Sequence, residues 1–457
     1  MLMRLLAALT FLWMSSSAAY ATGVDIAGRS IVGPEGKIYF PDASSATAIR
    51  VGAHFLVSVA PRARSVPRNI IPPTGYPVFN GDGEDFGFYD VVSYSVGSWP
   101  NAVAIADVNG DGRNDVILAT TFYFDPDNDY HIFVFIQDVD GSLMPPVAYA
   151  YAGTTNTVGL VTARLHDGTG SDIAVGTDSG INVFLATSSG LATPAFYLGQ
   201  KSDVLAGIDA NLDGNLDILG LSWSDNAPIY VNDGSGDFAT TSTLATHDAG
   251  YDSMRARDLD GDGLDDLLVA SGQGASDQSI NVHWQVGDPS VSGSGSLSAP
   301  TTFGPPQDSI WYADAGDINS DRKADIVASR AYNSPTWLWH FDGQGNHAFA
   351  VGQAYPSYDI PETVVVADIN LDGRQDIVTL HGGWNAAGLY LQARDSGMRP
   401  EQLFSIPYAS HYSATGLAIG DINRDGCPDA VIADYNQGLV ILYGHDCSDE
   451  IFQSDLE

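Results

Sequence analysis

Basic residues are scarce in this chain of 457 residues, which has 19 Lys and Arg against 56 Asp and Glu. The formal net charge of −37 argues against nucleic acid and anionic membrane surfaces as partners, because both attract basic proteins. Glu is scarcer still, since only six of the 56 acidic residues are Glu and the other 50 are Asp. Asp favours turns and caps whereas Glu favours helices, so we expect the acidity to lie in loops.

Long hydrophobic runs are missing after the first 21 residues. Residues 1–21 have the pattern of a cleaved secretory signal peptide: Arg4, an apolar segment over residues 5–14, and Ala19-Tyr20-Ala21 as an A-x-A cleavage site. The apolar segment is too short to span a bilayer as an anchor. We therefore expect a secreted, periplasmic or extracellular protein that does not insert into the membrane.

Cysteine is limited to Cys427 and Cys447. Their spacing is not C-x-x-C, which argues against a redox function. In a secreted protein an even pair predicts a disulfide. By the loop-entropy estimate, such a bond closing about 20 residues is worth roughly 3 kcal/mol.

Convincing amphipathic helices are also lacking. The chain instead has 49 Gly, 23 Pro and many Val, Ile, Thr and Tyr. These residues favour strands and turns. The composition therefore predicts an all-β protein.

The most informative stretch is Asp258-Leu-Asp260-Gly-Asp262-Gly263-Leu-Asp-Asp266, which precedes an apolar run. Acidic residues two apart can converge in a tight loop, and Gly263 supplies the positive φ that reverses it. Hard oxygen ligands at this density suit Ca²⁺, which takes six to eight oxygens. The stretch begins like an EF-hand but lacks the Glu at the twelfth position and the flanking helices. We therefore expect a calcium loop between two strands, although one copy alone could be a chance acidic cluster.

Six copies of this nine-residue spacing make a chance cluster untenable, and each precedes an apolar run. Together with a seventh, eroded copy at residues 164–172, they recur every 45 to 60 residues or so, which is typical of a repeat architecture. We expect about five to six Ca²⁺ sites. The predicted ligands are Asp107, Asn109, Asp111 and Asp115; Asp209, Asn211, Asp213 and Asp217; Asp258, Asp260, Asp262 and Asp266; Asp317, Asn319, Asp321 and Asp325; Asp368, Asn370, Asp372 and Asp376; and Asp421, Asn423, Asp425 and Asp429.

Two copies depart from the pattern. The copy at residues 164–172 has Arg164 at its first position and His166 at its third, so we interpret it as the same turn without the metal. In the Asp317 copy, Arg322 occupies the position of the Gly. A non-Gly residue in the left-handed conformation costs roughly 1–2 kcal/mol, so we expect a weaker site there.

Each repeat predicts four strands. The first leads into the acidic loop, as in residues 102–106, the second leaves it, the third resembles residues 131–135, and a Gly-rich turn gives the fourth. Seven such units predict a seven-bladed β-propeller. The last unit ends after its third strand, and residues 88–96 precede the first loop like an orphan fourth strand. We expect this strand to complete the last blade, because it would cover an open edge.

The segment before the repeats is different. Residues 48–60 read as a single strand and residues 61–77 as a Pro-rich linker. We therefore divide the chain into a signal peptide (1–21), an accessory segment and linker (22–80), the propeller (81–447) and a C-terminal tail (448–457).

The repeats resemble FG-GAP/VCBS repeats, the family that includes the integrin α-subunit propeller and many secreted bacterial proteins. The resemblance covers about residues 86–447 and rests on the six acidic loops. It implies a calcium-binding propeller. It does not settle the function, because the family includes adhesins, lectins and some polysaccharide-acting enzymes.

A ligand face is predicted opposite the acidic loops, where the other connections are rich in aromatic residues and in Asp, Asn and Ser. Flat rings beside hydrogen-bonding groups suit sugars or extended peptides, although many such rings could simply pack between blades. The residues we select are Trp99, Trp223, Trp311, Trp384 and Tyr412.

No catalytic motif is found, since the sequence contains neither G-x-S-x-G nor H-E-x-x-H. We therefore expect a non-catalytic binding or adhesion module for an extracellular glycan or protein. The alternative is a polysaccharide-acting lyase or hydrolase on a propeller scaffold. The oligomeric state is left open by the sequence.

Overall fold

The computed structural model shows an all-β protein. It describes residues 22–24, 30–32, 37–38, 43–51, 54–61, 86–89, 91–154, 158–188, 190–222, 226–245, 251–271, 279–304, 310–330, 337–382, 385–395, 397–410 and 413–447. Among these residues there is no helix with the length and apolarity needed to cross a bilayer.

The chain forms two compact units, and residues 1–66 belong to the smaller one. In this segment β1 (Thr22–Val24) pairs with β2 (Ser30–Val32), and β3 (Lys37–Ile38), β4 (Ala43–Val51) and β5 (His54–Pro61) form an antiparallel sheet. The prediction of one strand over residues 48–60 is wrong, because Val51 pairs with His54 and the chain reverses between them. The apolar alternation continues through both strands, so the pattern alone did not mark the reversal.

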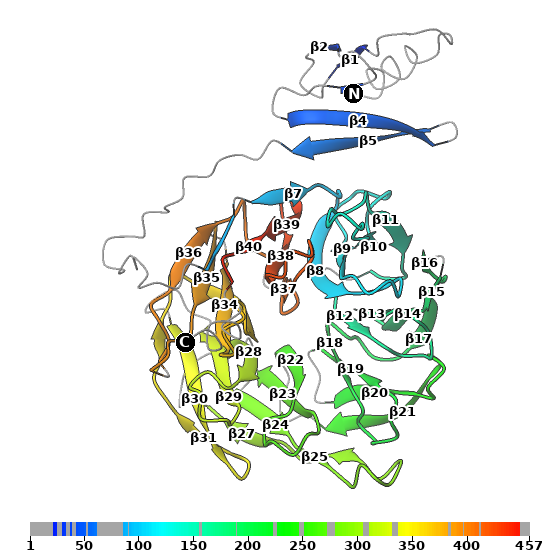
Figure 1. The fold of residues 1–457 in the computed structure, drawn as a ribbon. Helices are drawn as coiled ribbons and strands as arrows, with labels where there is room; N and C mark the ends of the chain where they lie inside the picture. The colour runs from blue at the N-terminus through cyan, green and yellow to red at the C-terminus, as the bar shows by residue number, and fades with distance from the viewer. Residues whose placement is uncertain are drawn as a thin grey trace, which may run out of the picture. The chain divides into compact units, whose positions relative to one another are not determined.

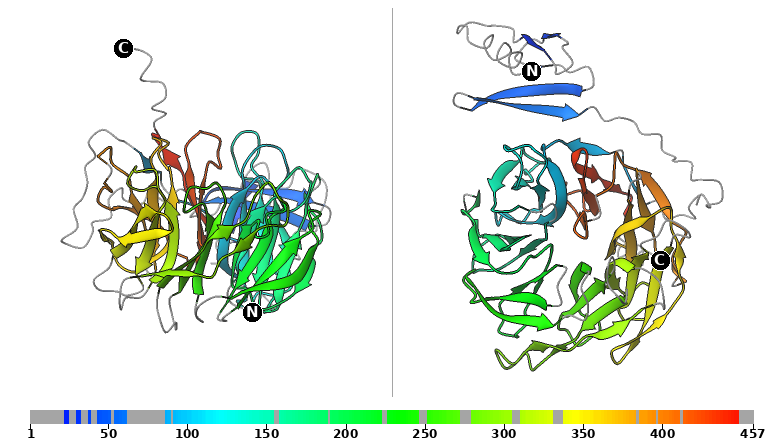
Figure 2. Two further views of the ribbon diagram at one scale, coloured as in Figure 1. Left: turned by 90° about the horizontal axis from the view of Figure 1, so that it is seen from below. Right: turned by 180° about the vertical axis from the view of Figure 1, so that it is seen from behind.

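The larger unit is a seven-bladed propeller, as the sequence predicted. Each blade is a sheet of four antiparallel strands, and the blades follow one another around a ring (Figure 1). The first strands of successive blades contact each other around the ring, and the first strand of blade 7 contacts that of blade 1. Figure 2 shows the same ring from the side and from behind.

The strands of the first four blades are as follows. Blade 1 contains β8 (Trp99–Ala106), β9 (Asp115–Thr121), β10 (His131–Phe135) and β11 (Val147–Ala150); blade 2 contains β12 (Leu160–Ala163), β13 (Asp172–Thr177), β14 (Gly180–Phe184) and β17 (Ala195–Leu198), with a side hairpin of β15 (Ala186–Thr187) and β16 (Gly190–Leu191). Blade 3 contains β18 (Val204–Ile208), β19 (Asp217–Leu221), β20 (Asn226–Asn232) and β21 (Phe238–Ala245); blade 4 contains β22 (Tyr251–Arg257), β23 (Asp266–Ser271), β24 (Ser279–His283) and β27 (Thr301–Phe303), with β25 (Gln285–Val286) and β26 (Ser296–Leu297) beside it.

The remaining three blades complete the ring. Blade 5 contains β28 (Ile310–Gly316), β29 (Asp325–Arg330), β30 (Trp337–Gly345) and β31 (Ala348–Val351), and β32 (Tyr355–Pro356) also pairs with β30; blade 6 contains β33 (Pro361–Ala367), β34 (Asp376–His381), β35 (Ala386–Tyr390) and β36 (Gln402–Ser405). Blade 7 contains β37 (Leu417–Gly420), β38 (Asp429–Asp434), β39 (Gly438–Leu442) and β7 (Val92–Tyr94).

Ring closure uses the segment before the first repeat, as predicted. β7 is the fourth strand of blade 7, next to β39. Just before it, β6 (Gly87–Phe88) pairs with β40 (Gly444–His445), so the predicted strand is divided between two ladders. Phe86 and Phe88 are buried, and Phe88 packs edge-on against Phe404 of blade 6 at 4.9 Å.

The core lies between neighbouring blades rather than at one centre. Ile117, Val134 and Ile173, for example, belong to a buried cluster that blades 1 and 2 share. Because the second strand of a blade is covered on both faces, β9, β13, β23 and β38 are buried along their whole length. This explains why each acidic loop precedes an unbroken apolar run, as is typical of strands buried on both faces.

A buried carboxylate holds every acidic loop against its own blade. The last Asp of the nine-residue spacing is at most 1% exposed in all seven repeats. One of its oxygens accepts a hydrogen bond from an amide of the loop, and the other accepts one from the amide at the end of the third strand, at 2.7–3.2 Å. The seven closing residues are Asp115, Asp172, Asp217, Asp266, Asp325, Asp376 and Asp429.

We expect the closing carboxylate to stabilise a blade whether or not its loop can hold a cation. Asp172 tests this, because its loop starts with Arg164. Asp172→Ala leaves the buried amides of Leu165 and Ala186 unpaired, which at about 1–3 kcal/mol for each amide lowers the free energy of unfolding by about 2–6 kcal/mol. Chemical denaturation in EDTA measures this loss. A change below about 0.5 kcal/mol would refute the structural role.

Two truncations test ring closure. Removing residues 1–80 leaves β6 and β7 in place, so we expect the propeller to melt near the temperature of the full chain. Removing residues 1–96 also deletes the buried Phe86 and Phe88, each worth about 1.5–3 kcal/mol, and exposes the edge of β39. The melting temperature should then drop by many degrees. Equal melting of the two truncated proteins would show that the segment does not close the ring.

Candidate functional site

The six complete acidic loops share one backbone conformation. Their fourth and sixth positions have positive φ; in the first loop these are Gly110 at 74° and Gly112 at 79°. The first Asp accepts hydrogen bonds from the amides of these turns, as Asp107 does from Gly110 and Gly112 at 2.7 Å each. The sequence indicated the positive φ at the sixth position. It did not reveal the positive φ at the fourth position, because four of the loops have a residue other than Gly there: Leu212, Ser320, Leu371 and Arg424.

Three carboxylates converge in the loop between β22 and β23. Oxygen atoms of Asp258, Asp260 and Asp262 all lie within 4.8 Å of one another. Ligands at 2.3–2.6 Å on opposite sides of a Ca²⁺ ion would be about 4.6–5.2 Å apart, so this spacing fits one ion. The donors are all hard oxygens, and the fit is therefore to Ca²⁺ rather than to a softer metal.

Five loops have Asn at the third position, and in four of them its side chain reaches the Asp two residues later. Asn109 Nδ2, for instance, is 2.8 Å from Asp111 Oδ2, and Asn423 Nδ2 is 2.8 Å from Asp425 Oδ2. The equivalent distances in the loops of Asn211 and Asn370 are both 3.0 Å. The predicted ligands of these loops therefore lie side by side.

Several fifth-position carboxylates have a basic partner that we did not predict. Arg113 and Arg374 form ion pairs with Asp111 and Asp372, and Lys323 Nζ lies 2.7 Å from Asp321. The basic residue is at the seventh position each time, so the pattern was visible in the sequence. Such a pair competes with a bound cation for the carboxylate, and we expect weaker cation binding in these loops. In the Asp258 loop, His347 Nε2 contacts Asp260 at 2.7 Å.

Five of the buried closing carboxylates have a raised pKa. Burial raises the pKa of Asp376 to about 8 and those of Asp217 and Asp429 to about 7, with backbone hydrogen bonds opposing the shift and neighbouring loop carboxylates adding to it. Burial likewise raises the pKa of Asp115 and of Asp266 to about 6. A cation beside such a carboxylate favours its ionised form, so the site gains charge balance from an ion.

The eroded repeat differs more than we predicted. All of residues 164–172 are described, and none has a positive φ, so this is not the same turn. Only the closing Asp172 is retained. His166 Nδ1 lies 2.8 Å from Asp172 Oδ2, and the imidazole thus provides a hydrogen-bonding partner where the other loops place an oxygen ligand.

The Asp317 loop keeps the shared backbone despite its missing Gly, because Arg322 adopts φ 68°. Its Asn319 behaves differently from the other third-position residues. The side-chain amide donates to Asp342 Oδ1 at 2.8 Å, whereas its counterparts face the fifth-position Asp. Its Oδ1, the atom that would bind a cation, still accepts a hydrogen bond from the amide of Asp321 at 2.9 Å, as in the other loops. Only the amide group of Asn319 is directed elsewhere.

On the opposite face, the structure describes two of the five predicted ligand residues. Trp99 begins β8 and lies between Tyr123, at 4.4 Å, and Tyr435, at 4.7 Å. Trp311 lies in β28 and contacts Tyr312 edge-on at 6.3 Å. Trp223, Trp384 and Tyr412 lie outside the described residues.

The two cysteines form a disulfide in the structure. Cys427 lies in the last acidic loop and Cys447 follows β40, and their Cα atoms are 5.6 Å apart. The bond joins the loop of blade 7 to the chain just after the ladder of β40 and β6. It therefore holds the C-terminal end of the propeller at the junction of the ring.

Solved structures resemble this propeller at low identity. They include BBS1N in complex with ARL6DN (9% identity, 78% of this chain and 96% of that chain, TM-score 0.50) and the WD40 propeller domain of Doa1 (14%, 79% and 97%, TM-score 0.48). A third is an Agrocybe aegerita protein described as recognising non-reducing terminal N-acetylglucosamine (15%, 77% and 86%, TM-score 0.48). At these identities the likeness concerns the fold alone.

The repeats themselves are matched by a family model. No curated protein matches this chain. A model described as an FG-GAP-like repeat matches residues 209–269, 258–328 and 317–379. Each match begins at the first Asp of an acidic loop and runs into the second strand of the next blade. With the matched repeats, residues 209–379, built into a ring of seven four-stranded blades, the chain is a β-propeller that contains FG-GAP-like repeats.

Proposed function

We propose that this chain is a secreted, calcium-binding propeller that acts as a non-catalytic binding module for an extracellular glycan or protein. The acidic loops would hold calcium on one face of the ring, and the ligand would bind on the other. The observation that carries the proposal is a rigid, partly exposed group of aromatic rings on the face opposite the acidic loops.

Calcium would be held by the first, third, fifth and ninth residues of the six loops predicted from the sequence. When bound, the ion supplies positive charge that cross-links carboxylates at the junction of the first two strands. The protein's own contribution is to orient these carboxylates through backbone amides. The spacing of Asp258, Asp260 and Asp262 supports this assignment most directly.

The aromatic surface consists of residues from blades 1 and 7: Trp99, Phe122, Tyr123, Phe124, Tyr130, Tyr408 and Tyr435. All lie at strand ends or connections opposite the acidic loops. Phe124 is 83% exposed and Tyr123 is 49% exposed. Exposed rings of this size, in contact with further aromatic rings, are typical of a binding surface rather than of packing between blades.

The loop of residues 122–130, which carries four of these rings, is held by one buried carboxylate. Asp129 is 9% exposed, and it accepts hydrogen bonds from the amide of Tyr123 at 2.8 Å and from that of Asp125 at 3.1 Å. Phe124 and Tyr130 have positive φ, at 59° and 57°. A strained loop that is fixed in this way presents its rings before a ligand arrives, which reduces the entropy cost of binding.

The chemistry of this surface suits both ligand classes. Flat rings stack on the apolar faces of sugars or on extended peptides, and neighbouring carboxylates and amides, such as Asp125 and Asn128, can accept and donate hydrogen bonds. A glycan array incubated with the protein, followed by analysis of any hit for cleavage products, separates the proposal from the alternative of a polysaccharide-acting enzyme.

Calcium should raise the stability of the folded chain, because an ion that binds only the folded state stabilises it by RT ln(1 + [L]/Kd) for each site. We expect a markedly higher melting temperature in millimolar calcium than in EDTA. Identical melting curves would contradict calcium binding.

Asp262→Asn and Asp167→Asn separate ligand loss from charge loss. Both remove one negative charge, but Asp262 is a predicted ligand and Asp167 lies in the eroded loop. Titration calorimetry should find one fewer calcium ion bound by Asp262→Asn and no change for Asp167→Asn. Equal effects of the two substitutions would mean that only net charge matters.

Substitution of an exposed ring should weaken ligand binding without unfolding the protein. Phe124→Ala should change the free energy of unfolding by about 0.5 kcal/mol or less, while an anchoring ring contributes about 1 kcal/mol or more to binding. Phe196→Ala is the matched control, because Phe196 is also exposed, at 42%, but lies on the outer strand β17. Binding to the array hit and thermal unfolding measure both effects. Unchanged binding by Phe124→Ala would show that the ligand binds at another surface.

A further inference from the structure

Blade 5 differs from the other six at two positions of its third strand. The registers of the second and third strands place His340, opposite Val327, where the other blades have Val134, Val183, Ile229, Val282, Leu389 and Ile441. Two residues later, Asp342 stands where they have Ile136, Leu185, Val231, Trp284, Leu391 and Tyr443. Two apolar positions on the same face of the strand have thus become an imidazole and a carboxylate.

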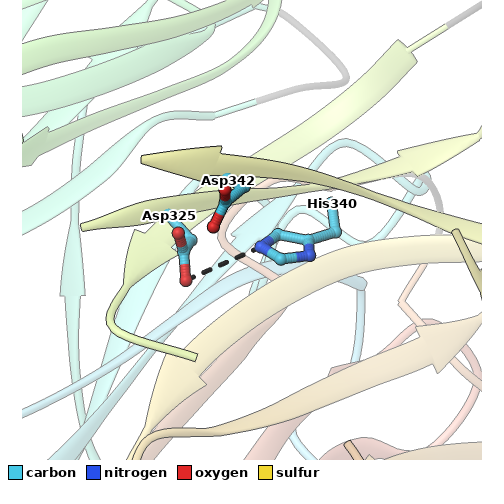
Figure 3. Close-up of side chains that lie close together, drawn as sticks. All are labelled: Asp325, His340 and Asp342. Carbon is cyan, nitrogen blue, oxygen red and sulfur yellow. Dashed lines mark ion pairs between the residues drawn. The ribbon is translucent and has the colours of Figure 1, made fainter. Parts of the chain in front are cut away.

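These two side chains meet the closing carboxylate of their own blade. Ligand atoms of Asp325, His340 and Asp342 all lie within 4.8 Å of one another (Figure 3). His340 Nε2 and Asp325 Oδ2 are 3.6 Å apart, which is too far for a hydrogen bond. Two ligands of one tetrahedral zinc ion, each at 2.0–2.2 Å from the metal, are about 3.3–3.6 Å apart.

The imidazole nitrogen that faces this carboxylate has no hydrogen-bond partner. His340 is 6% exposed, and its Nε2 is buried and unpaired. Its other nitrogen, Nδ1, lies 3.3 Å from Tyr355 Oη. When Nδ1 carries the proton and donates it to Tyr355, Nε2 presents its lone pair toward the carboxylates. Metal-binding histidines are usually held in this way, with the second ring nitrogen donating to a neighbour.

The carboxylates are oriented by donors of the same blade. Asp325 accepts hydrogen bonds from the amides of Ile318 and Gly343. Asp342 Oδ1 accepts one from Asn319 Nδ2 at 2.8 Å, and its other oxygen accepts one from Gln344. Each carboxylate oxygen has two lone pairs, so these bonds fix the direction of the groups without using their full capacity.

We propose that Asp325, His340 and Asp342 form a site for a divalent transition-metal ion, best suited to Zn²⁺, separate in chemistry from the calcium loops. One imidazole and two carboxylates match zinc in ligand type, whereas Ca²⁺ takes oxygen ligands. The site shares Asp325 with the Asp317 loop. It therefore takes one of that loop's four predicted calcium ligands, while the amide group of Asn319 orients Asp342.

The site has access to a cavity. His340 and Asp342 line a space of about 530 Å³ between blades 5 and 6, together with residues that include Tyr390, Met398 and Arg399. Three protein ligands leave one tetrahedral position for water or another ligand, which is the arrangement of zinc sites that bind exchangeable groups. An ion can therefore enter from the cavity without opening the blade.

A simple pairing of a protonated His340 with its two carboxylates is the competing explanation. Such a pair needs no metal, but it should draw His340 Nε2 into hydrogen-bond distance of an oxygen, and the observed nitrogen remains unpaired. Buried ion pairs with poor geometry do not repay the desolvation of their charges. The two explanations differ in whether the protein takes up zinc.

The decisive experiment uses the full-length protein, freed of metal with a chelator and then saturated with calcium. Zn²⁺ is titrated in competition with a chromophoric zinc chelator. We expect one high-affinity equivalent in the unaltered protein and its loss in His340→Leu. This substitution restores the kind of residue that Leu389 provides at the equivalent position of blade 6, so the fold should be kept. Asp342→Asn should weaken zinc binding at least tenfold.

His283→Phe is the matched control. His283 is also buried with an unpaired Nε2, but it is not part of any carboxylate cluster among the described residues, and the equivalent residue of blade 5 is Phe341. Zinc uptake should be unchanged in this variant. Equal zinc uptake by the unaltered protein and His340→Leu, or no tight equivalent at all, would overturn the proposal. If His340→Leu fails to fold, the zinc affinity of Asp342→Asn decides whether the proposal holds.

A second readout distinguishes binding at this site from loose binding to surface histidines. Co²⁺ in place of zinc gives strong visible absorption when it is tetrahedral and weak absorption when it is bound loosely in octahedral geometry. We expect the strong bands in the unaltered protein and in His283→Phe, and their disappearance in His340→Leu. Strong bands that persist in His340→Leu would assign the ion to other ligands.

Discussion

The buried closing carboxylate is the interaction on which each blade depends. In Asp115, as in its six counterparts, one oxygen holds the loop and the other holds the end of the third strand. A buried carboxylate is costly unless it is hydrogen-bonded, and each of its two oxygens accepts a bond from an amide. The same bonds bring the loop to a fixed position over its blade. The eroded repeat shows which part is indispensable, because it has lost its ligands and its loop conformation but has kept Asp172.

This constraint separates the two faces of the ring. On one face the first strand of every blade except blade 2 enters an acidic turn with two residues of positive φ, so that face varies little. The connections on the other face carry no such requirement. There the chain could build the aromatic surface around Trp99 and fix it locally with Asp129. Stability and the proposed ligand recognition can therefore vary independently, which is common where variable loops are positioned by a rigid scaffold.

Repetition also makes departures visible. Six third strands place aliphatic side chains where blade 5 has His340. A polar pair in such a position loses apolar burial, which is worth about 25 cal/mol for each Å² removed from water. A compensating interaction is therefore expected, and the nearby Asp325 is the closing residue that every blade already possesses. A new site can thus be built by changing two residues.

The sequence by itself determined the repeat, its four-strand units, the propeller and the role of residues before the first repeat in closing the ring. These follow from local patterns, because the acidic spacing and the apolar run after it recur at a fixed period. It also placed the acidic residues of each loop, since neighbours two apart in a tight turn must converge.

The tertiary structure alone decided what depends on contacts between distant residues. That the ninth-position Asp binds the end of the third strand could not be read from the spacing, because its partners lie 14–22 residues further along the chain. The reversal after Val51 was hidden because both strands keep the same alternation. Trp99 meets Tyr435, and Asp325 meets His340, only when strands align in register and blades pack side by side. The order of residues along the chain gives neither of these distances.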